Sequence, residues 1–272
     1  MHRLQCALLA TVAVIGFASI ASAADMPTKA PVYKAAPAII APSWAGWYIG
    51  VNAGWVGSGR NISNTGTDNG GGGLGALLAA GAIPASVSLN NNGFIGGAQI
   101  GYNWQVANWV YGLEADFDGA SAKSSTTAVF PGSLAFIPLS TTYNRQLDWL
   151  ATFRGRIGIT ATPAFLLYAT GGLAVGNTKI GNSFICAGCA PPASTEPSTA
   201  NQTSNTSAGW TVGAGLEWMF APQWSLKAEY LYVDLGSHSS TITYTYGGST
   251  STLTSTVRDT ENIVRGGINY HF

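Results

Sequence analysis

The sequence predicts an all-β fold, an eight-stranded antiparallel up-and-down barrel that spans a membrane, and three observations support this prediction. Several segments alternate apolar and polar residues with period two. Short turns alternate with long polar connections along the chain. Only 9% of residues are charged, yet no apolar stretch of about 20 residues follows the N-terminal segment. Such a chain can cross a bilayer as a closed sheet, because open strand edges would leave backbone groups unpaired in lipid.

The first 23 residues have the pattern of a secretory signal peptide. His2 and Arg3 give a positive start, residues 7–20 form an apolar core, and Ala21-Ser22-Ala23 matches a cleavage site. The alternative is a first transmembrane helix, which the shortness of the apolar run and its small C-terminal residues disfavour. We therefore expect export from the cytoplasm and leave this segment out of the fold.

The next segment, residues 24–43, shows no periodicity and contains four prolines, which cannot donate to a strand ladder. We expect an extended periplasmic tether there, followed by the barrel over residues 44–272. The prolines are Pro27, Pro31, Pro37 and Pro42.

Eight segments carry the alternation. The expected strands are residues 47–56, 94–104, 109–118, 148–160, 165–176, 209–220, 224–235 and 262–272. In each strand the large apolar side chains share one face, which we expect to meet lipid, and the opposite face lines the lumen. Leu231 and Val233 break this rule, because they are apolar residues on the polar face.

The connections differ in length in a regular way. Tight turns are expected at residues 105–108, 161–164 and 221–223, and long polar loops at residues 57–93, 119–147, 177–208 and 236–261. Short periplasmic turns and long extracellular loops are the layout of an outer-membrane barrel. Aromatic residues near the turn side fit a membrane–water boundary: Trp47, Trp104, Trp109, Phe165, Phe220, Trp224 and Phe272. The alternative, a soluble sandwich, would rarely sort its loops in this way.

Several stretches resemble a known family. They are the signal ending A-S-A-A-D, the opening S-W-A-G-W-Y-I-G-V-N-A-G-W, the segment L-K-A-E-Y-L-Y-V-D-L-G and the terminal aromatic residue. The chain resembles the small outer-membrane β-barrels of alphaproteobacteria, the immunogenic, opacity-like proteins often labelled porin family. The resemblance implies an eight-stranded barrel that folds into the outer membrane with the barrel-assembly machinery, which reads the C-terminal strand with Tyr270 and Phe272.

Eight charged residues fall on the expected lumen face, four acidic and four basic. They are Glu114, Asp116, Arg154, Arg156, Glu217, Lys227, Glu229 and Arg265. Unpaired charges in a dry lumen would be costly, so we expect them to pair with one another. Folding about Pro222 places Glu217 opposite Lys227, and we expect an ion pair between these two residues.

An eight-stranded barrel has an interior that side chains can fill. The charge network therefore predicts a plugged or barely conducting lumen. The alternative is a narrow, gated pore that opens when the network rearranges.

No catalytic residues, cofactor or metal site are expected. His238 lies in a serine-rich loop with Asp259 and Glu261 farther along the chain, and His271 lies near the turn rim. The sequence shows no nucleophile and base with an acid that orients the base. Cys186 and Cys189 are spaced as C-A-G-C, which in an oxidising compartment favours a disulfide within the loop. Two cysteines alone are too few for a metal site.

The glycine-rich run in the first loop lacks the ending of a phosphate-binding loop. We expect a flexible loop with an apolar patch over residues 74–83, which packs on the barrel rim or contacts a partner.

Three functions remain open: a structural, surface-exposed envelope protein, a narrow diffusion channel for small solutes, and a lipid-modifying or proteolytic barrel enzyme. The first is favoured and the third is least supported. Equal numbers of basic and acidic residues argue against nucleic acid as a partner. Outer-membrane lipid is the expected partner in the cell envelope, and the sequence leaves the oligomeric state open.

Overall fold

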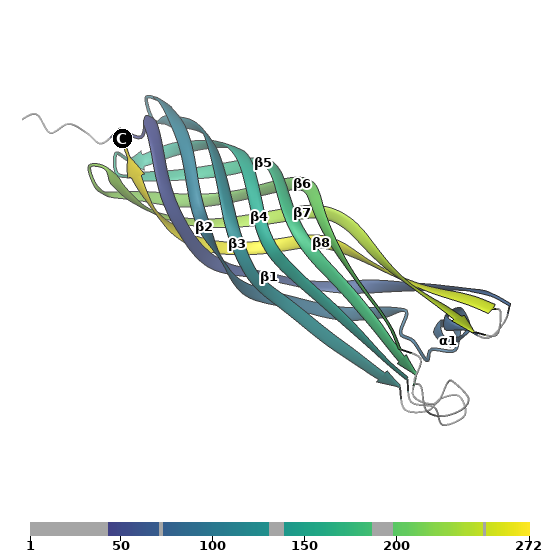
Figure 1. Cartoon of the computed structure of the whole chain (residues 1–272). Helices are drawn as coiled ribbons and strands as arrows, with labels where there is room; N and C mark the ends of the chain where they lie inside the picture. The colour runs from purple at the N-terminus through teal and green to yellow at the C-terminus, as the bar shows by residue number, and fades with distance from the viewer. Residues whose placement is uncertain (1–42, 71–72, 131–138, 187–197, 247–248) are drawn as a thin grey trace, which may run out of the picture. The chain divides into compact units, whose positions relative to one another are not determined.

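The structure, a computed structural model, describes residues 43–70, 73–130, 139–186, 198–246 and 249–272. Eight antiparallel strands close into one barrel in chain order, and β1 pairs with β8 (Figure 1). The strands are β1 (Gly46–Asn69), β2 (Ser86–Val106), β3 (Trp109–Phe130), β4 (Leu139–Thr162), β5 (Phe165–Cys186), β6 (Ser198–Ala221), β7 (Trp224–Tyr246) and β8 (Ser249–His271). The predicted fold class is confirmed. The predicted signal peptide and residues 24–42 of the predicted tether lie outside the described residues.

The seam between β1 and β8 closes the barrel. Tyr48 is opposite His271, and the backbone N–H of Phe272 donates to the carbonyl of Trp47 at 3.0 Å. The three tight turns lie at this end, which is called the turn end below. The opposite end is called the far end.

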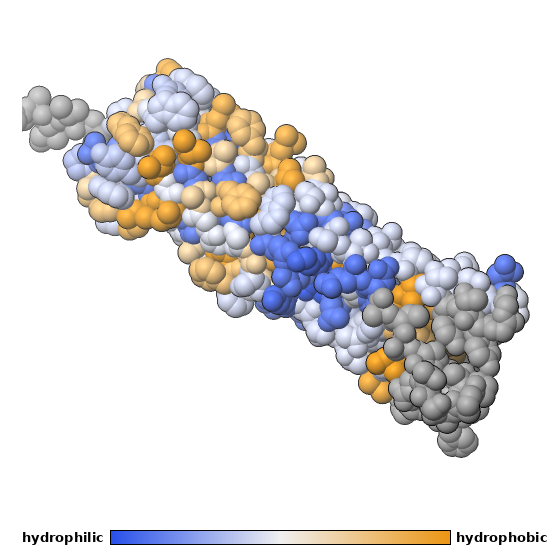
Figure 2. Space-filling view, in the orientation of Figure 1, coloured by the Kyte–Doolittle hydropathy of each residue, from blue (hydrophilic) through white to orange (hydrophobic). Residues whose placement is uncertain are grey.

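Large apolar side chains cover the outside of the barrel near the turn end. Figure 2 shows these hydrophobic residues near the chain's C-terminus and a hydrophilic zone beyond them. Aromatic pairs frame this apolar band on both sides. The pairs at the turn edge are Trp47–Tyr102 and Trp224–Tyr270, and those at the other edge are Phe117–Trp149 and Trp210–Tyr232. An apolar band between two aromatic girdles is the surface that a lipid bilayer requires.

Every strand is longer than predicted, because much of each predicted long loop continues as strand. The outer face of these extensions is rich in serine, threonine and asparagine. The sequence there therefore lacks the alternation of apolar and polar residues that a lipid-facing strand shows. The inner face still carries apolar residues such as Ile62, Leu89, Ile180 and Val257, all buried. These strands face water on the outside and pack on the inside, so they lack the apolar outer face by which lipid-facing strands are recognised in a sequence.

The extensions are two sheets rather than a complete barrel. The β2–β3 ladder ends at Asn92 and Lys123, and the β6–β7 ladder ends at Trp210 and Asp234. Beyond these points β7, β8, β1 and β2 form one sheet, and β3, β4, β5 and β6 form the other. Figure 1 shows the two groups of ribbons separating toward the far end.

A short helix, α1 (Leu74–Ala79), lies at the far end, so the prediction of a flexible loop is wrong there. Its apolar side chains pack with residues of both sheets in a cluster of Leu74, Ala82, Ile83, Phe184, Ile242 and Leu253. Of the two alternatives for the apolar patch, packing on the barrel is the one observed. No helix among the described residues is long and apolar enough to cross a membrane.

Asp68 of β1 holds the first turn of α1. Its carboxylate accepts backbone N–H groups from Gly75 at 2.9 Å, Ala76 at 2.7 Å and Gly73 at 3.3 Å. The hydrogen bond from Gly75, followed by those from Ser251, Ala76 and Gly73, lowers the pKa of Asp68 despite a small opposing effect of burial. These N–H groups have no partner within the helix, and an acidic group near them is stabilising.

Candidate functional site

The lumen holds a network of charged side chains that we call the central charge network. It contains the eight predicted residues and Asp118, all buried. They come from β3, β4, β6, β7 and β8. Asp118 was missed, although it occupies the next inward position after Asp116 and could have been found by extending the alternation.

Glu114 lies at the centre of this network. Its carboxylate forms ion pairs with Lys227 at 2.7 Å, with Arg156 at 3.6 Å and with Arg154. The Tyr48 hydroxyl also donates to it at 2.7 Å. Arg265 lies 4.0 Å from it, so this one carboxylate compensates cations from three other strands.

Arg265 of the last strand joins four acids, the most distant of which is Glu114 at 4.0 Å. Its guanidinium lies 2.9 Å from Asp116, 2.7 Å from Asp118 and 2.7 Å from Glu229. Arg154 contacts Asp116 and Glu229 as well. Because the arginines share acids, the network is continuous across the lumen from β3 and β4 to β7 and β8.

The predicted ion pair between Glu217 and Lys227 is wrong, although these residues are directly opposite each other on β6 and β7. Glu217 pairs with Arg156 at 3.2 Å and accepts hydrogen bonds from Ser225 and Asn269. Lys227 instead reaches across the lumen to Glu114. In a narrow barrel a long side chain can contact the opposite wall as easily as its ladder neighbour.

Aromatic rings and apolar residues close the network on the turn side. The Arg156 guanidinium lies 4.9 Å from the ring centre of Tyr48 and 5.0 Å from that of Tyr168. Closer to the turn end lies a cluster of Trp44, Val110, Leu166, Tyr168 and Met219. The Trp44 indole N–H donates to the carbonyl of Pro163, which fixes the tryptophan at this end of the lumen.

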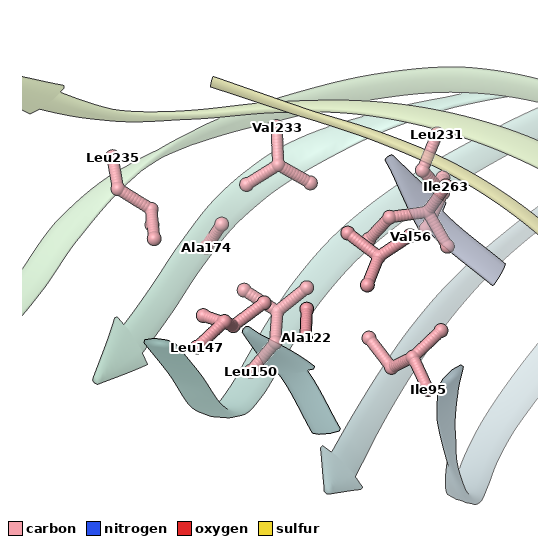
Figure 3. Packing of buried hydrophobic residues seen from close by; sticks show 10 residues of the cluster. All are labelled: Val56, Ile95, Ala122, Leu147, Leu150, Ala174, Leu231, Val233, Leu235 and Ile263. Atoms are coloured by element: carbon pink, nitrogen blue, oxygen red, sulfur yellow. The ribbon is translucent and has the colours of Figure 1, made fainter. Parts of the chain in front are cut away.

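On the other side of the network, apolar side chains cross the lumen in what we call the apolar layer. Its members are Val56, Ile95, Ala122, Leu147, Leu150, Ala174, Leu231, Val233, Leu235 and Ile263. Every strand except β6 contributes to it, and Figure 3 shows these side chains converging from opposite walls. Leu231 and Val233, the two exceptions to the predicted alternation, therefore face inward because they belong to this layer.

Beyond the apolar layer lies a second group of buried charges, the outer charge cluster of Arg60, Arg145, Asp259 and Glu261. Arg145 lies 2.8 Å from Asp259 and 2.7 Å from Glu261, and Arg60 lies 2.9 Å from Asp259. Burial, with the nearby positive charge of Arg145, lowers the pKa of the Arg60 guanidinium. Continuing the period-two face backward from Arg265 would have placed Glu261 and Asp259 in the lumen.

The residues considered for catalysis do not form a catalytic arrangement among the described residues. His238 approaches Asp259 at 3.8 Å, but two arginines already hold that carboxylate. His271 lies 3.0 Å from the Ser225 hydroxyl, and Glu217 beside them is paired with Arg156. No group of metal-binding side chains is found within the described part of the chain.

The predicted disulfide cannot be followed to its second cysteine. Cys186 is the last residue of β5, and Cys189 lies outside the described residues. The pairing stays a prediction.

Comparison with known proteins identifies the family. Residues 10–272 match the family described as outer membrane protein beta-barrel domain. The 31 kDa outer-membrane immunogenic protein of Brucella melitensis is 36% identical over 85% of this chain and 88% of its own length. The 22 kDa outer membrane protein of Rhizobium leguminosarum is 30% identical over 74% of this chain and 69% of its own.

A solved structure also aligns with this chain. OprG from Pseudomonas aeruginosa aligns over 84% of this chain and 97% of its own, with a TM-score of 0.42 and 13% identity. The sequence matches, together with the closed barrel and its outward apolar band, show that this chain belongs to the outer-membrane β-barrel family, close to the alphaproteobacterial immunogenic proteins, and resides in the outer membrane.

Proposed function

We propose that this protein is a non-conducting barrel with a structural and surface role in the cell envelope, and that it has no enzymatic activity. The observation that carries the proposal is the apolar layer, which lies between two buried charge groups. A hydrated ion that followed the lumen would have to lose its water at this layer. Hydrophobic constrictions close channels in this way, by excluding water.

The position of the apolar layer makes it the decisive barrier. The β2–β3 ladder ends at Asn92–Lys123 and the β6–β7 ladder ends at Trp210–Asp234, so the described residues of the far half form no closed ring of strands. Beyond the apolar layer the two sheets are joined at these two places by side-chain contacts, whereas at the layer itself they are still joined by backbone ladders. The central charge network adds a second barrier, because its ion pairs would have to separate to admit a solute.

A narrow diffusion channel is the second candidate, and one observation favours it. The side-chain amides of Asn52 and Asn103 on the turn side and of Asn91 on the far side are buried without a hydrogen-bond partner in the protein. Buried polar groups of this kind are commonly satisfied by water. Water on both sides of the apolar layer would become a continuous path if the layer opened.

Planar-bilayer recording of the refolded protein separates the two candidates. We expect the wild type to show no stable conductance, and the double variant Leu147→Ser/Leu231→Ser to conduct because it makes the apolar layer polar. The matched control, Ile242→Ser/Leu253→Ser, changes two apolar side chains of the far-end cluster and should stay silent.

A large, stable conductance of the wild type would favour the channel. Silence of the Leu147→Ser/Leu231→Ser variant, with folding verified, would show that the apolar layer is not the barrier. The variant Lys227→Ala, recorded beside these, tests whether the central charge network gates conduction.

The envelope role is tested in cells. We expect deletion to increase sensitivity to detergent and bile salts without slowing the uptake of small solutes. The reverse result would favour the channel.

Outer-membrane lipid and the barrel-assembly machinery are the partners that this function requires. Tyr270 and Phe272 lie together on the outer face of the turn end, with ring centres 5.2 Å apart. We expect the variant Tyr270→Ser/Phe272→Ser to accumulate unfolded in the periplasm, and Ser249→Ala at the start of the same strand to assemble normally.

A further inference from the structure

The outer surface of the barrel carries a polar pocket of about 480 Å³ just beyond the apolar band. Its lining includes Lys123, Asn144, Gln146, Lys179, Gly181 and Gln202. These residues belong to β3, β4, β5 and β6 and face outward, away from the lumen. We call it the outer pocket, and neither the lumen nor the proposed function uses it.

Strand register builds the outer pocket from two parallel rows. In one row Lys123 is opposite Gln146, and Gln146 is opposite Lys179. The two ammonium groups therefore belong to strands on either side of the Gln146 amide. Strands lie about 4.8 Å apart, so the lysine backbones are about 10 Å apart, and their flexible side chains can converge on one anion.

The second row supplies the floor and the uncharged polar walls. Asn144 is opposite Gly181, and Gly181 is opposite Gln202. Glycine has no side chain, so the centre of this row is a buried recess with amides on both sides. Amide side chains both donate and accept hydrogen bonds, which suits the hydroxyl groups of a sugar.

The charge of the outer pocket favours an anion. Asp148 is the acid beside it, and it lies 2.7 Å from Lys179 and accepts a hydrogen bond from Gln146. Lys123 is exposed and has no ion-pair partner among the described residues. One acid faces two cations, so a net positive charge remains.

The level of the outer pocket relative to the membrane indicates the source of the anion. Trp149, in the aromatic girdle at the far edge of the apolar band, comes shortly after Gln146 along β4. Aromatic girdles lie at the level of the lipid headgroups. The outer pocket therefore lies at the outer edge of the headgroup layer of the outer leaflet. Basic residues at this level attract anionic headgroups.

We propose that the outer pocket binds the headgroup of a phosphorylated glycolipid in the outer leaflet. The two lysines hold the phosphate, and the amides of the Asn144–Gly181–Gln202 row hold sugar hydroxyls over the glycine floor.

The test is native mass spectrometry of the refolded full chain in detergent. The added probe is a disaccharide lipid with one phosphate, and the comparison probes are the same lipid without phosphate, phosphatidylglycerol and inorganic phosphate. We expect a retained one-to-one adduct with the phosphorylated disaccharide lipid alone. Lys123→Gln should weaken it about fivefold, the change that corresponds to about 1 kcal/mol for one lysine near an anionic headgroup.

Two further variants isolate the site. Gly181→Leu fills the floor without a change of charge and should also weaken the adduct. Arg258→Gln is the matched control, because it removes one exposed cation from the outer face of β8, where Arg258 pairs with Asp234. It should leave the adduct unchanged.

Three results would overturn the proposal. One is the absence of a wild-type adduct with the phosphorylated disaccharide lipid. Another is equal weakening by Arg258→Gln and Lys123→Gln, which would indicate general charge attraction. The third is equal retention of phosphatidylglycerol or inorganic phosphate, which would remove the role of the sugar. Resistance of the folded band to dissociation on a gel verifies that each variant is folded.

Discussion

In the membrane half of the barrel all eight strand ladders are formed, whereas in the half beyond it the described residues form no β2–β3 or β6–β7 ladder. The difference follows from the solvent outside. A strand edge in lipid would leave backbone groups without partners, so the sheet must close there. In water an open edge is tolerated, because water satisfies its N–H and carbonyl groups.

The same comparison applies to side chains. In the membrane half the outer face is apolar and the buried interior is highly charged. In the far half the outer face is polar, and charges alternate with apolar clusters inside. Four predictions test whether substitutions in the two halves change the stability of the protein to different extents.

The largest effect is expected from Glu114→Ala. This change leaves the buried residues Lys227, Arg154 and Arg156 short of one shared acid, and breaking a buried pair costs about 3–5 kcal/mol. Urea unfolding in lipid vesicles, followed by tryptophan fluorescence, measures the loss. Asp148→Ala, which removes a surface acid, should cost less than about 0.5 kcal/mol. Equal losses would mean that water reaches the central charge network.

The next effect separates the two outer faces on one strand. Val51→Arg places a cation on the apolar band and should cost about 2–4 kcal/mol near the middle of the bilayer. Ser63→Arg on the same strand lies on the exposed far half and should change stability by about 0.5 kcal/mol or less. The same unfolding assay compares them, and a costly Ser63→Arg would place the membrane boundary farther along β1.

A smaller effect is expected from Arg145→Ala in the outer charge cluster. Asp259 and Glu261 would keep Arg60, so each of these buried acids loses one of its two cations and neither is left unpaired. The cost should be about 1–3 kcal/mol, the range for a buried group left partly unsatisfied. A loss as large as that of Glu114→Ala would show that Arg60 does not compensate the two acids.

The smallest effect concerns the pH dependence of α1. The pKa of Asp68 is lowered in the folded protein, so its stabilising contribution is fully present above the usual aspartate pKa of about 3.9. It is lost as pH falls through the lowered value, because the protonated carboxyl no longer accepts the N–H groups well. Hydrogen-exchange protection of Gly75 and Ala76 should fall over that acid range in the wild type. Asp68→Asn should be less protected at neutral pH and lack this acid dependence.

The sequence predicted the membrane half well because lipid and lumen impose opposite polarity on successive residues. Trp210, Val212 and Leu216 face outward, and Glu217 faces inward, as the alternation indicates. The apolar layer could not be predicted, since Leu231, Leu147 and Val56 come into one cluster only once the register of several strands is fixed.

The partners of the lumen charges were harder to predict than their positions. Lys227 and Glu217 are ladder neighbours, as the turn predicts, yet Lys227 reaches Glu114 of β3. The acid that a long basic side chain reaches depends on the width of the barrel and the stagger of its strands. The sequence of one hairpin determines neither of them. The far half was underestimated for a different reason, because serine and threonine on a water-facing strand resemble loop residues.

The seam between β1 and β8 has a consequence for the order of assembly. It joins Tyr48 to His271, near opposite ends of the barrel sequence, whereas every other ladder joins consecutive strands. Contacts between residues so distant along the chain have the highest entropic cost of closure and form late. Until they form, β1 and β8 each keep an open edge. The last step of assembly is therefore also the step that first makes the sheet compatible with lipid, so closure and stable membrane residence should be one kinetic event.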